Sequence, residues 1–364
     1  MSRIRIAVLF GGRSGEHDVS RVSARHVAAA LDPERYEVIP VAITRQGQWL
    51  LPELSRRVLA GGALQVPEQA FEASGQPVAL EPAGGRGAGE VRSGLPVDVV
   101  FPVLHGPFGE DGTVQGLLEM AGIPYVGSGV LGSAVGMDKD VMKRLFREAG
   151  LPIGAFTVIR DYAWADARSE CLARAGRLGY PCFVKPASLG SSLGVSRCRD
   201  GEELAAGIAE AFRHDRKVLV EEAIVGREIE VGVLGNDHPE ASVPGEIIPG
   251  AEFYSYDAKY VDETSRLVIP AELPAQAVAA LRSAAVAAFQ AVEAAGMARV
   301  DFFYRDKEND IVVNEINTIP GFTVISMFPK LWAASGLSYP ELLDRLVGLA
   351  LERAGQSAWP LREL

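Results

Sequence analysis

The chain has 364 residues, of which 48% are hydrophobic and 23% are charged, so it can form two or three globular domains. Its formal net charge of -11 argues against a duplex nucleic-acid binder, which carries a basic surface. A nucleotide site remains compatible with this charge, because it needs only a few local cations. Three cysteines without C-x-x-C spacing predict reduced thiols in a cytoplasmic protein.

The first 122 residues alternate strand-like and helix-like patterns, which is typical of a parallel α/β unit. The first apolar run is short and leads into glycines, so it predicts a strand and not a signal peptide. A stretch rich in Gly, Pro, Ala and Glu at 52–95 predicts an exposed, mobile loop region. Strands are expected at 4–10, 36–43 and 97–104, and helices at 20–31 and 112–122.

A helix is expected to begin near Asp138, which can cap it, and to end at Gly150 and Pro152. The alternation continues, with strands expected at 155–159, 182–185 and 217–221 and helices at 164–178 and 200–213. In the last part, the sequence predicts a strand at 228–235, a long helix at 274–296, a hairpin and a final helix at 339–354. The segment 277–298 contains Arg282 and Glu293, and is too polar to span a bilayer.

These patterns predict an α/β fold that becomes α+β in its C-terminal part. We expect three domains, each of a size that can fold as a unit. They are an N-terminal α/β domain with a parallel sheet over residues 1–135, a central domain over 136–230 and a C-terminal domain over 231–364.

The glycines that follow the first strand do not match the dinucleotide-binding pattern G-x-G-x-x-G. The side chain of interest there is Glu16, whose carboxylate can hold a substrate ammonium or, equally, cap the next helix. His105 begins the run H-G-P-F-G-E-D-G after another strand, where open α/β sheets bind ligands. On position alone, a structural hydrogen bond is the preferred interpretation of His105.

Lys185 lies on a strand that leads into a Gly/Ser loop containing Ser191 and Ser192. Small residues let backbone N–H groups approach phosphate oxygens, so this segment predicts a phosphate site, with a surface turn as the alternative. An acidic linker at 221–228 can offer groups to an adenine and a ribose. The run Y-S-Y-D-A-K-Y at 254–260 predicts either a lid that excludes water or an ordinary surface loop.

The run N-E-I-N-T near the C-terminus places Glu315 and Asn317 on alternate residues, which share one face of a strand. The preceding strand-like run, 299–304, contains Asp301, and the polar residues 306–309 suit a hairpin loop. If Asp301 lies opposite Glu315, three oxygen donors converge in an incomplete cage that suits magnesium bound with a nucleotide. Two strands with a solvated polar face are the alternative.

The order of these motifs resembles the ATP-grasp fold, and the whole chain resembles the D-alanine–D-alanine ligases. The motifs that carry the resemblance are G-G-R-S-G-E-H-D-V-S at 11–20, H-G-P-F-G-E-D-G at 105–112, S-L-G-S-S-L-G-V at 188–195, Y-D-A-K-Y at 256–260 and N-E-I-N-T-I-P-G-F-T at 314–323. The resemblance implies ATP-dependent joining of two D-alanines through an acyl phosphate, for peptidoglycan synthesis. It also implies a cytoplasmic homodimer with no nucleic-acid or membrane partner.

The resemblance assigns roles to matching positions. Two magnesium ions, for which Mn²⁺ can substitute, would be bound by Asp301, Glu315 and Asn317. ATP would be bound by Lys139, Lys185, Ser192, Glu221, Glu222, Ile224, Glu228 and Lys259. Catalysis would rest on Glu16, Ser191, Arg299, Gly321 and Tyr260. The substrates would also meet His105, Ser326 and Met327.

Two positions depart from part of the family. Glu222 stands where some members have lysine, which leaves its adenine contact open, and Met327 replaces a leucine whose backbone makes the contact. In relatives that make D-alanyl-D-lactate, the lid position of Tyr260 resembles a histidine-bearing loop instead. The A-K-Y found here favours an amine nucleophile. The alternatives are a ligase for D-lactate or D-serine, a silent nucleotide-binding regulator and a dinucleotide-dependent oxidoreductase.

Overall fold

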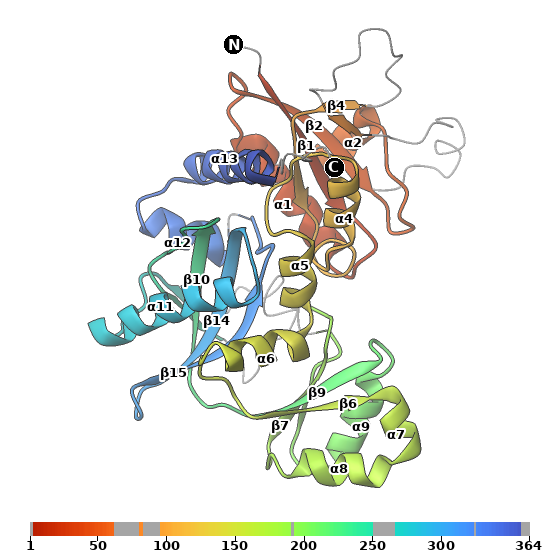
Figure 1. Cartoon of the computed structure of the whole chain (residues 1–364), viewed down its shortest axis with the longest axis vertical. Coiled ribbons are helices and arrows are strands. Elements are labelled where there is room, and N and C mark those ends of the chain that lie inside the picture. The colour runs from red at the N-terminus through yellow and green to blue at the C-terminus, as the bar shows by residue number, and fades with distance from the viewer. Residues whose placement is uncertain are drawn as a thin grey trace, which may run out of the picture.

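The computed structural model describes residues 3–61, 80–82, 95–190, 193–249, 266–323 and 325–357. These residues form three regions, each built on its own sheet, stacked along the long axis of the molecule (Figure 1). The N-terminal region lies at one end, the region of β6, β7 and β9 at the other, and the region of β10, β14 and β15 between them. None of the helices in the described residues is long and apolar enough to cross a membrane.

The N-terminal sheet is parallel, with the order β2 (Tyr36–Ile43), β1 (Ile4–Gly11), β5 (Val99–Val103). Parallel strands are covered on both faces, so they read as continuous apolar runs. The helices of this region are α1 (His17–Ala30), α2 (Pro52–Leu59) and α4 (Thr113–Met120). Two further short strands, β3 (Leu80–Pro82) and β4 (Leu95–Val97), form a separate pair.

The two faces of β1 belong to two different cores. Val8 and Phe10 pack in a core that includes residues of α1 and of the last helix, α13 (Tyr339–Ser357), whereas Ala7 and Leu9 pack in a core with α4. The C-terminal helix therefore completes the core of the N-terminal sheet, and Figure 1 shows α13 beside that sheet.

The sheet of the central region is antiparallel, with the order β6 (Phe156–Arg160), β9 (Lys217–Glu222), β7 (Cys182–Pro186), β8 (Ser196–Cys198). Its core includes the three cysteines, which are buried free thiols. The helices of this region and of the connection that leads into it are α5 (Val130–Met137), α6 (Lys139–Glu148), α7 (Asp161–Asp166), α8 (Arg168–Gly176) and α9 (Gly201–Ala211).

The third sheet is also antiparallel, and its core lies mainly against α11 (Ala275–Ala291). Its order is β13 (Arg266–Val268), β12 (Gly245–Ile248), β10 (Arg227–Gly235), β14 (Gly296–Arg305), β15 (Asp310–Asn317), and β11 (Glu240–Ala241) pairs with β10. The helix α12 (Met327–Ala334) contacts β10.

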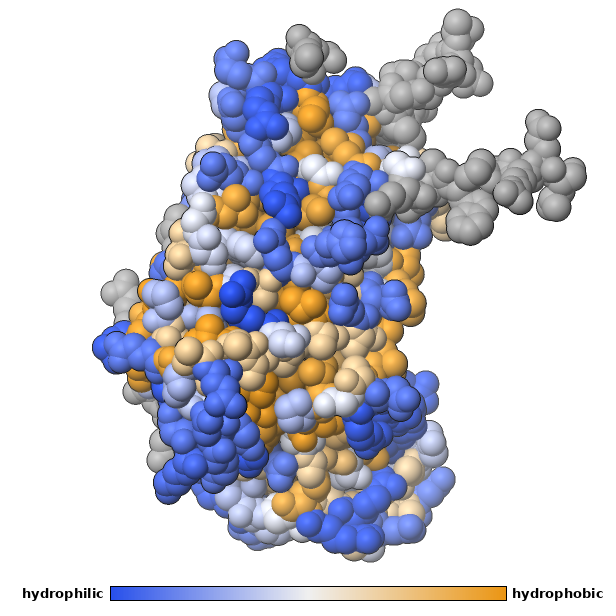
Figure 2. All heavy atoms as spheres, turned by 60° about the vertical axis from the view of Figure 1, so that its left-hand side comes forward, coloured by the Kyte–Doolittle hydropathy of each residue, from blue (hydrophilic) through white to orange (hydrophobic). Residues whose placement is uncertain are grey.

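Over one face of the molecule, hydrophilic residues predominate, and hydrophobic residues gather in the lower middle between hydrophilic patches (Figure 2).

The predicted fold class is confirmed: a parallel N-terminal sheet is followed by antiparallel sheets. Asp138 caps α6 as predicted, since its side chain accepts hydrogen bonds from the backbone of Asp140 and Val141. The predicted domain division stays a prediction, and β10 runs across its second boundary as one continuous strand.

Two predictions of local structure were wrong. The helix expected at 164–178 is two helices, α7 and α8, because Ala167 has a non-helical backbone with φ of -142°. Part of the expected loop at 52–95 is the helix α2, since Pro52 suits a first helical turn and Val58 is buried. Most of that expected loop lies outside the described residues.

Candidate functional site

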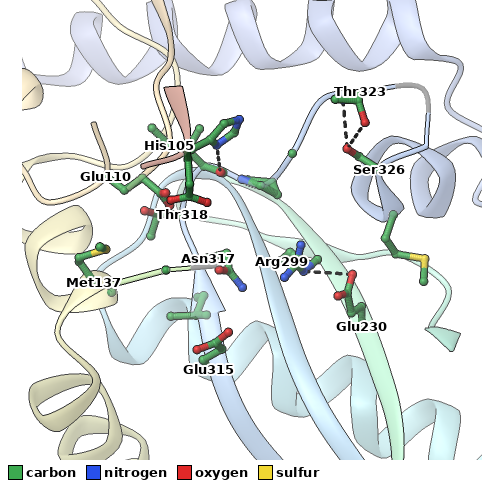
Figure 3. A pocket seen from close by; sticks show the side chains of 18 of the residues that line it. His105, Glu110, Met137, Glu230, Arg299, Glu315, Asn317, Thr318, Thr323 and Ser326 are labelled. Carbon is green, nitrogen blue, oxygen red and sulfur yellow. Dashed lines mark hydrogen bonds and ion pairs between the residues drawn. The ribbon is translucent and has the colours of Figure 1, made fainter. Parts of the chain in front are cut away.

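A cavity lies where the N-terminal region, α6, the loop after β7 and the third sheet meet. Figure 3 shows this cavity from close by, with Arg299, Glu315 and Asn317 on the strands of the hairpin and Glu230 facing Arg299. Nine of the predicted site residues line it: Glu16, His105, Lys139, Arg299, Glu315, Asn317, Gly321, Ser326 and Met327.

The β14–β15 hairpin has the predicted register. Asp301 lies directly opposite Glu315, and Arg299 lies opposite Asn317, so these four residues share one face of the hairpin. The polar residues 306–309 form the turn between the strands, as predicted. The register therefore brings two carboxylates and a carboxamide together beside a guanidinium.

These groups are held in an ordered network. Arg299 donates to both oxygens of Asp301, from Nε and Nη2 at 2.7 Å each. Asn317 Nδ2 lies 3.0 Å from Asp301 Oδ2, and Lys139 Nζ lies 3.6 Å from Glu315 Oε2. Each side chain of the predicted metal set is thus already oriented by a neighbour.

The donor set fits magnesium. Carboxylate and carboxamide oxygens are the ligands that Mg²⁺ prefers, and it usually completes its shell with waters and substrate phosphates. Within the described residues, no group of three or more His, Cys, Asp or Glu could by itself hold a metal ion. Two acids and one amide therefore suit an ion shared with a phosphate better than an all-protein cage.

Glu16 also lines the cavity, between two glycine-containing loops. Its carboxylate approaches so closely that a Cβ at Gly106 would lie 2.6 Å from Oε2, and a Cβ at Gly190 would lie 3.2 Å from it. Gly106 also has φ of +75°, which L residues rarely adopt. The N-terminal region and the loop after β7 therefore meet at this buried carboxylate.

His105 is buried, and both of its ring nitrogens have protein partners. Nδ1 lies 3.1 Å from the backbone oxygen of Ile319, and Nε2 lies 3.3 Å from Ser23 Oγ. Burial lowers the pKa of His105 below its usual value, so the ring is neutral at neutral pH. The geometry favours the structural interpretation, in which His105 ties the N-terminal region to the segment after β15.

A second charged cluster lies near the end of β9. Lys185 Nζ is 2.9 Å from Glu221 Oε2, and Lys143 Nζ is 3.4 Å from Glu221 Oε1. Burial acts to raise the pKa of Glu221, but the charges of the two lysines outweigh it, and the pKa falls below its usual value. Burial lowers the pKa of Lys143, which is 3% exposed.

The remaining predicted nucleotide residues lie near this cluster in the chain. Glu222 Oε1 accepts a hydrogen bond of 2.7 Å from the backbone N–H of Ala155, so one of its oxygens serves the backbone. The Ile224 side chain lies against Gly154. Glu228 is on β10, opposite Phe303 of β14.

Gly321, Ser326 and Met327 lie together where α12 begins. A Cβ at Gly321 would lie 2.7 Å from Ser326 Oγ, so only glycine fits there without a shift. Thr323 holds the same hydroxyl through its backbone N–H, at 3.0 Å, and through its own Oγ1, at 2.7 Å. Met327 is the first residue of α12, where backbone N–H groups are unpaired within the helix.

Four predicted residues, Ser191, Ser192, Lys259 and Tyr260, lie outside the described residues. Sequence reasoning gave no role to three others that the structure places in the clusters: Lys143, Glu110 and Glu230. Lys143 was signalled by its spacing of four from Lys139 on one helix, and Glu230 by its alternation with Glu228 on a strand.

Glu110 belongs to the motif that begins at His105, but only the fold explains its state. Its carboxylate lines the cavity and accepts a 2.5 Å hydrogen bond from the backbone of Gly106. Burial and the charge of Glu16 raise the pKa of Glu110 to about 8. Two acids thus face one end of the cavity, and one of them holds its proton near neutral pH.

Comparison with known proteins matches both halves of the chain to one family. A family model described as the D-ala D-ala ligase N-terminus matches residues 5–128, and one described as the D-ala D-ala ligase C-terminus matches residues 145–348. The D-alanine–D-alanine ligase of Geobacillus thermodenitrificans is 49% identical over 355 residues, which cover 96% of each chain. That of Kineococcus radiotolerans is 52% identical over 369 residues, which cover 96% of this chain and 97% of the relative.

Solved structures agree with the sequence matches. The D-alanine–D-alanine ligase of Coxiella burnetii has a TM-score of 0.82 at 36% identity and covers 98% of this chain and 97% of its own. The VanG D-Ala:D-Ser ligase of Enterococcus faecalis has a TM-score of 0.80 at 38% identity and covers 96% and 100%. The fold and the site thus define the class, the ATP-grasp ligases. Within that class, the chain belongs to the D-alanine–D-alanine ligase family.

Proposed function

We propose that this protein joins two D-alanines to D-alanyl-D-alanine at the expense of ATP, and so supplies the dipeptide for peptidoglycan. The observation that carries the proposal is the match to D-alanine–D-alanine ligases along nearly the whole chain, with 49% identity over 96% of each sequence. The cavity supports it, because it contains the charged groups that the reaction requires.

In the first step, a carboxylate oxygen of one D-alanine attacks the terminal phosphorus of ATP, and the bond from that phosphorus to ADP breaks. We assign Glu16 to the ammonium of this D-alanine, since it is a buried carboxylate lining the cavity. Lys139 and Lys185 offset the charge of the phosphates, joined by Lys259. Such a step is accelerated mainly by positioning and electrostatics.

Asp301, Glu315 and Asn317 are the residues that would hold two magnesium ions, with Mn²⁺ able to substitute. Bound there, the ions would neutralise phosphate charge and orient the terminal phosphate. This assignment is supported by the donor types and by the register of the hairpin.

In the second step, the amine of the other D-alanine attacks the acyl carbon, loses a proton, and phosphate leaves as its C–O bond breaks. We assign Arg299 and the Gly321 N–H to the oxyanion of the tetrahedral species. Ser326 and the Met327 N–H would hold the carboxylate of this D-alanine. The start of a helix suits an anion, which supports this assignment.

The nucleotide and lid assignments rest on the resemblance. Glu221, Glu222 and the backbone near Ile224 would meet adenine, Glu228 the ribose and Ser192 a phosphate. Ser191 and Tyr260 would link to Glu16 and close a lid that protects the acyl phosphate from water.

We also propose that the enzyme is a homodimer that acts in the cytoplasm, where ATP is available. Three large apolar side chains on the neighbouring helices α4 and α5 support a dimer, because they are strongly exposed: Leu117 at 53%, Met120 at 92% and Leu131 at 60%. Sedimentation of the wild type and of Met120→Glu would test this, since a monomeric wild type contradicts it.

The second substrate is tested by incubating the purified protein with ATP, D-alanine and an equal concentration of D-serine or D-lactate. The similarity to a D-Ala:D-Ser ligase makes D-serine the second candidate. We expect mass spectrometry to find mainly D-alanyl-D-alanine at neutral pH. A mixed product in excess over that dipeptide would contradict the proposal.

A further inference from the structure

Three carboxylates lie in one row across the third sheet. Asp301 on β14 is directly opposite Glu230 on β10 and directly opposite Glu315 on β15. Like charges that face each other across strands repel, so such a row needs cations between its members. Lys139 approaches Glu315, and Arg299 lies between the other two acids.

Arg299 is shared unequally by its two acids. It makes a bidentate pair with Asp301, at 2.7 Å for both contacts, while its Nε lies 3.1 Å from Glu230 Oε2. All three side chains are largely buried, with exposures of 17% for Arg299, 14% for Asp301 and 8% for Glu230. Figure 3 shows the contact between Glu230 and Arg299 at the edge of the cavity.

The bidentate pair competes with the role proposed for Asp301. Both oxygens of Asp301 accept hydrogen bonds from Arg299, and Oδ2 also accepts from Asn317, so Oδ1 keeps one lone pair for an ion. An ion bound there would draw the negative charge of Asp301 away from Arg299, so we expect metal binding to weaken this pair. A largely buried guanidinium that loses its carboxylate is costly unless another carboxylate replaces it.

We propose that Glu230 is the positioning residue that holds Arg299 in the cavity when Asp301 turns to the metal. This inference rests on the proposed function and deepens it. Glu230 keeps the guanidinium paired, so Asp301 is released at low cost and Arg299 stays where the oxyanion would form. Glu230 acts through Arg299 and makes no contact with the reacting atoms.

The test measures metal binding without turnover. Mn²⁺ is titrated into the enzyme in the presence of ADP, and free Mn²⁺ is followed by electron paramagnetic resonance. In Glu230→Gln, Arg299 loses one of its two acidic partners and depends more on Asp301, so we expect Mn²⁺ binding to weaken by about tenfold. Glu230→Asp, which keeps the charge, should recover part of the loss.

Glu246→Gln is the matched control. Glu246 lies on β12 of the same sheet, is similarly buried at 8%, and makes a bidentate pair with Arg227 at 2.8 and 2.6 Å. It does not line the cavity. We expect its Mn²⁺ binding to stay within about twofold of wild type. An equal loss in this control would show a general effect on the sheet and overturn the proposal.

Arg299→Gln separates positioning from simple attraction between a carboxylate and the ion. If Glu230 acts through Arg299, Glu230→Gln should weaken Mn²⁺ binding in the wild type but by less than about twofold in the Arg299→Gln background. A loss of equal size in both backgrounds would overturn the proposal.

Failure of this inference is distinct from failure of the proposed function. A wild type that neither binds Mn²⁺ with ADP nor makes the dipeptide contradicts the proposed function. A wild type that does both, with Glu230→Gln unchanged in Mn²⁺ affinity and in kcat, contradicts only the role of Glu230.

Discussion

Two charged clusters in this protein have opposite compositions. Beside the cavity, one cation, Arg299, lies between two acids, Glu230 and Asp301. Near the end of β9, one acid, Glu221, lies between two cations, Lys143 and Lys185. The first cluster has a surplus of negative charge, which suits a metal ion, and the second has a surplus of positive charge, which suits a phosphate.

The clusters also differ in their surroundings. Arg299 and Glu230 line the cavity, whereas Glu221 and Lys143 do not line it. A group that faces a cavity can exchange its partner for a ligand. Glu221 is buried and pairs two lysines within the protein, so its loss should be felt in stability as well as in nucleotide binding. The comparison therefore separates a cluster expected to govern turnover from one expected to govern folding and nucleotide binding.

The largest expected effect is on turnover, from Arg299→Ala. Loss of a donor to an oxyanion typically lowers the rate by roughly 10²–10³-fold, so release of phosphate in the presence of D-alanine should fall by that factor. Arg305→Ala is the control, since Arg305 ends the same strand and pairs with Asp310, whose side chain is 43% exposed. A variant of Arg299 that retains more than about a tenth of the activity contradicts its assignment.

The next effect is on stability, from Glu221→Gln. It leaves two largely buried lysines without their shared carboxylate, so the free energy of unfolding measured in urea should fall by about 3 kcal/mol. The neighbouring Glu222→Gln removes the charge of a carboxylate that accepts a hydrogen bond from the Ala155 backbone. The free energy of unfolding should then fall by about 1 kcal/mol. Equal losses in the two variants would show that the lysines do not depend on Glu221.

A smaller effect is expected from Lys143→Met. Without Lys143, Lys185 takes a larger share in neutralising Glu221 and has less charge to offer a phosphate, so KM for ATP should rise by about fivefold to tenfold. We expect kcat to change by less than KM. Arg147→Met is the control, because it removes an exposed positive charge from the same helix and should leave KM for ATP unchanged. An equal rise of KM in both variants would show that only the net charge of the protein matters.

The smallest effect concerns pH and the buried acids beside Glu16. The pKa of Glu110 is raised to about 8 from 4.5, so the folded state holds a proton that the unfolded chain releases. This contribution to stability is complete below about pH 4.5 and is lost as the pH rises through about 8. Glu110→Gln cannot ionise, so its Tm relative to wild type should rise between about pH 5 and about pH 9.

Exposed Glu148 provides the control for this pH dependence. Its change to glutamine should give a Tm difference that stays constant over the same range. A Tm difference for Glu110→Gln that is also constant would contradict the raised pKa.

Much of the hairpin could be predicted from the sequence, because its determinants are local. The alternation of Glu315 and Asn317, the polar turn and the position of Asp301 together define the register that the structure shows. The cap of α6 by Asp138 is local in the same way. The split between α7 and α8 was missed, because a single non-helical residue at Ala167 interrupts an otherwise continuous helical pattern.

By itself, the sequence determined the class of fold, the family resemblance and nine of the residues that line the cavity, because strand alternation, glycine loops and motif order act over short stretches of chain. Only the tertiary structure decided that Glu230 faces Arg299, that Lys143 shares Glu221 with Lys185, and that α13 completes the N-terminal core. Those contacts join segments far apart in the chain. Their existence depends on which strands become neighbours and which faces are buried, and no local pattern of residues specifies that.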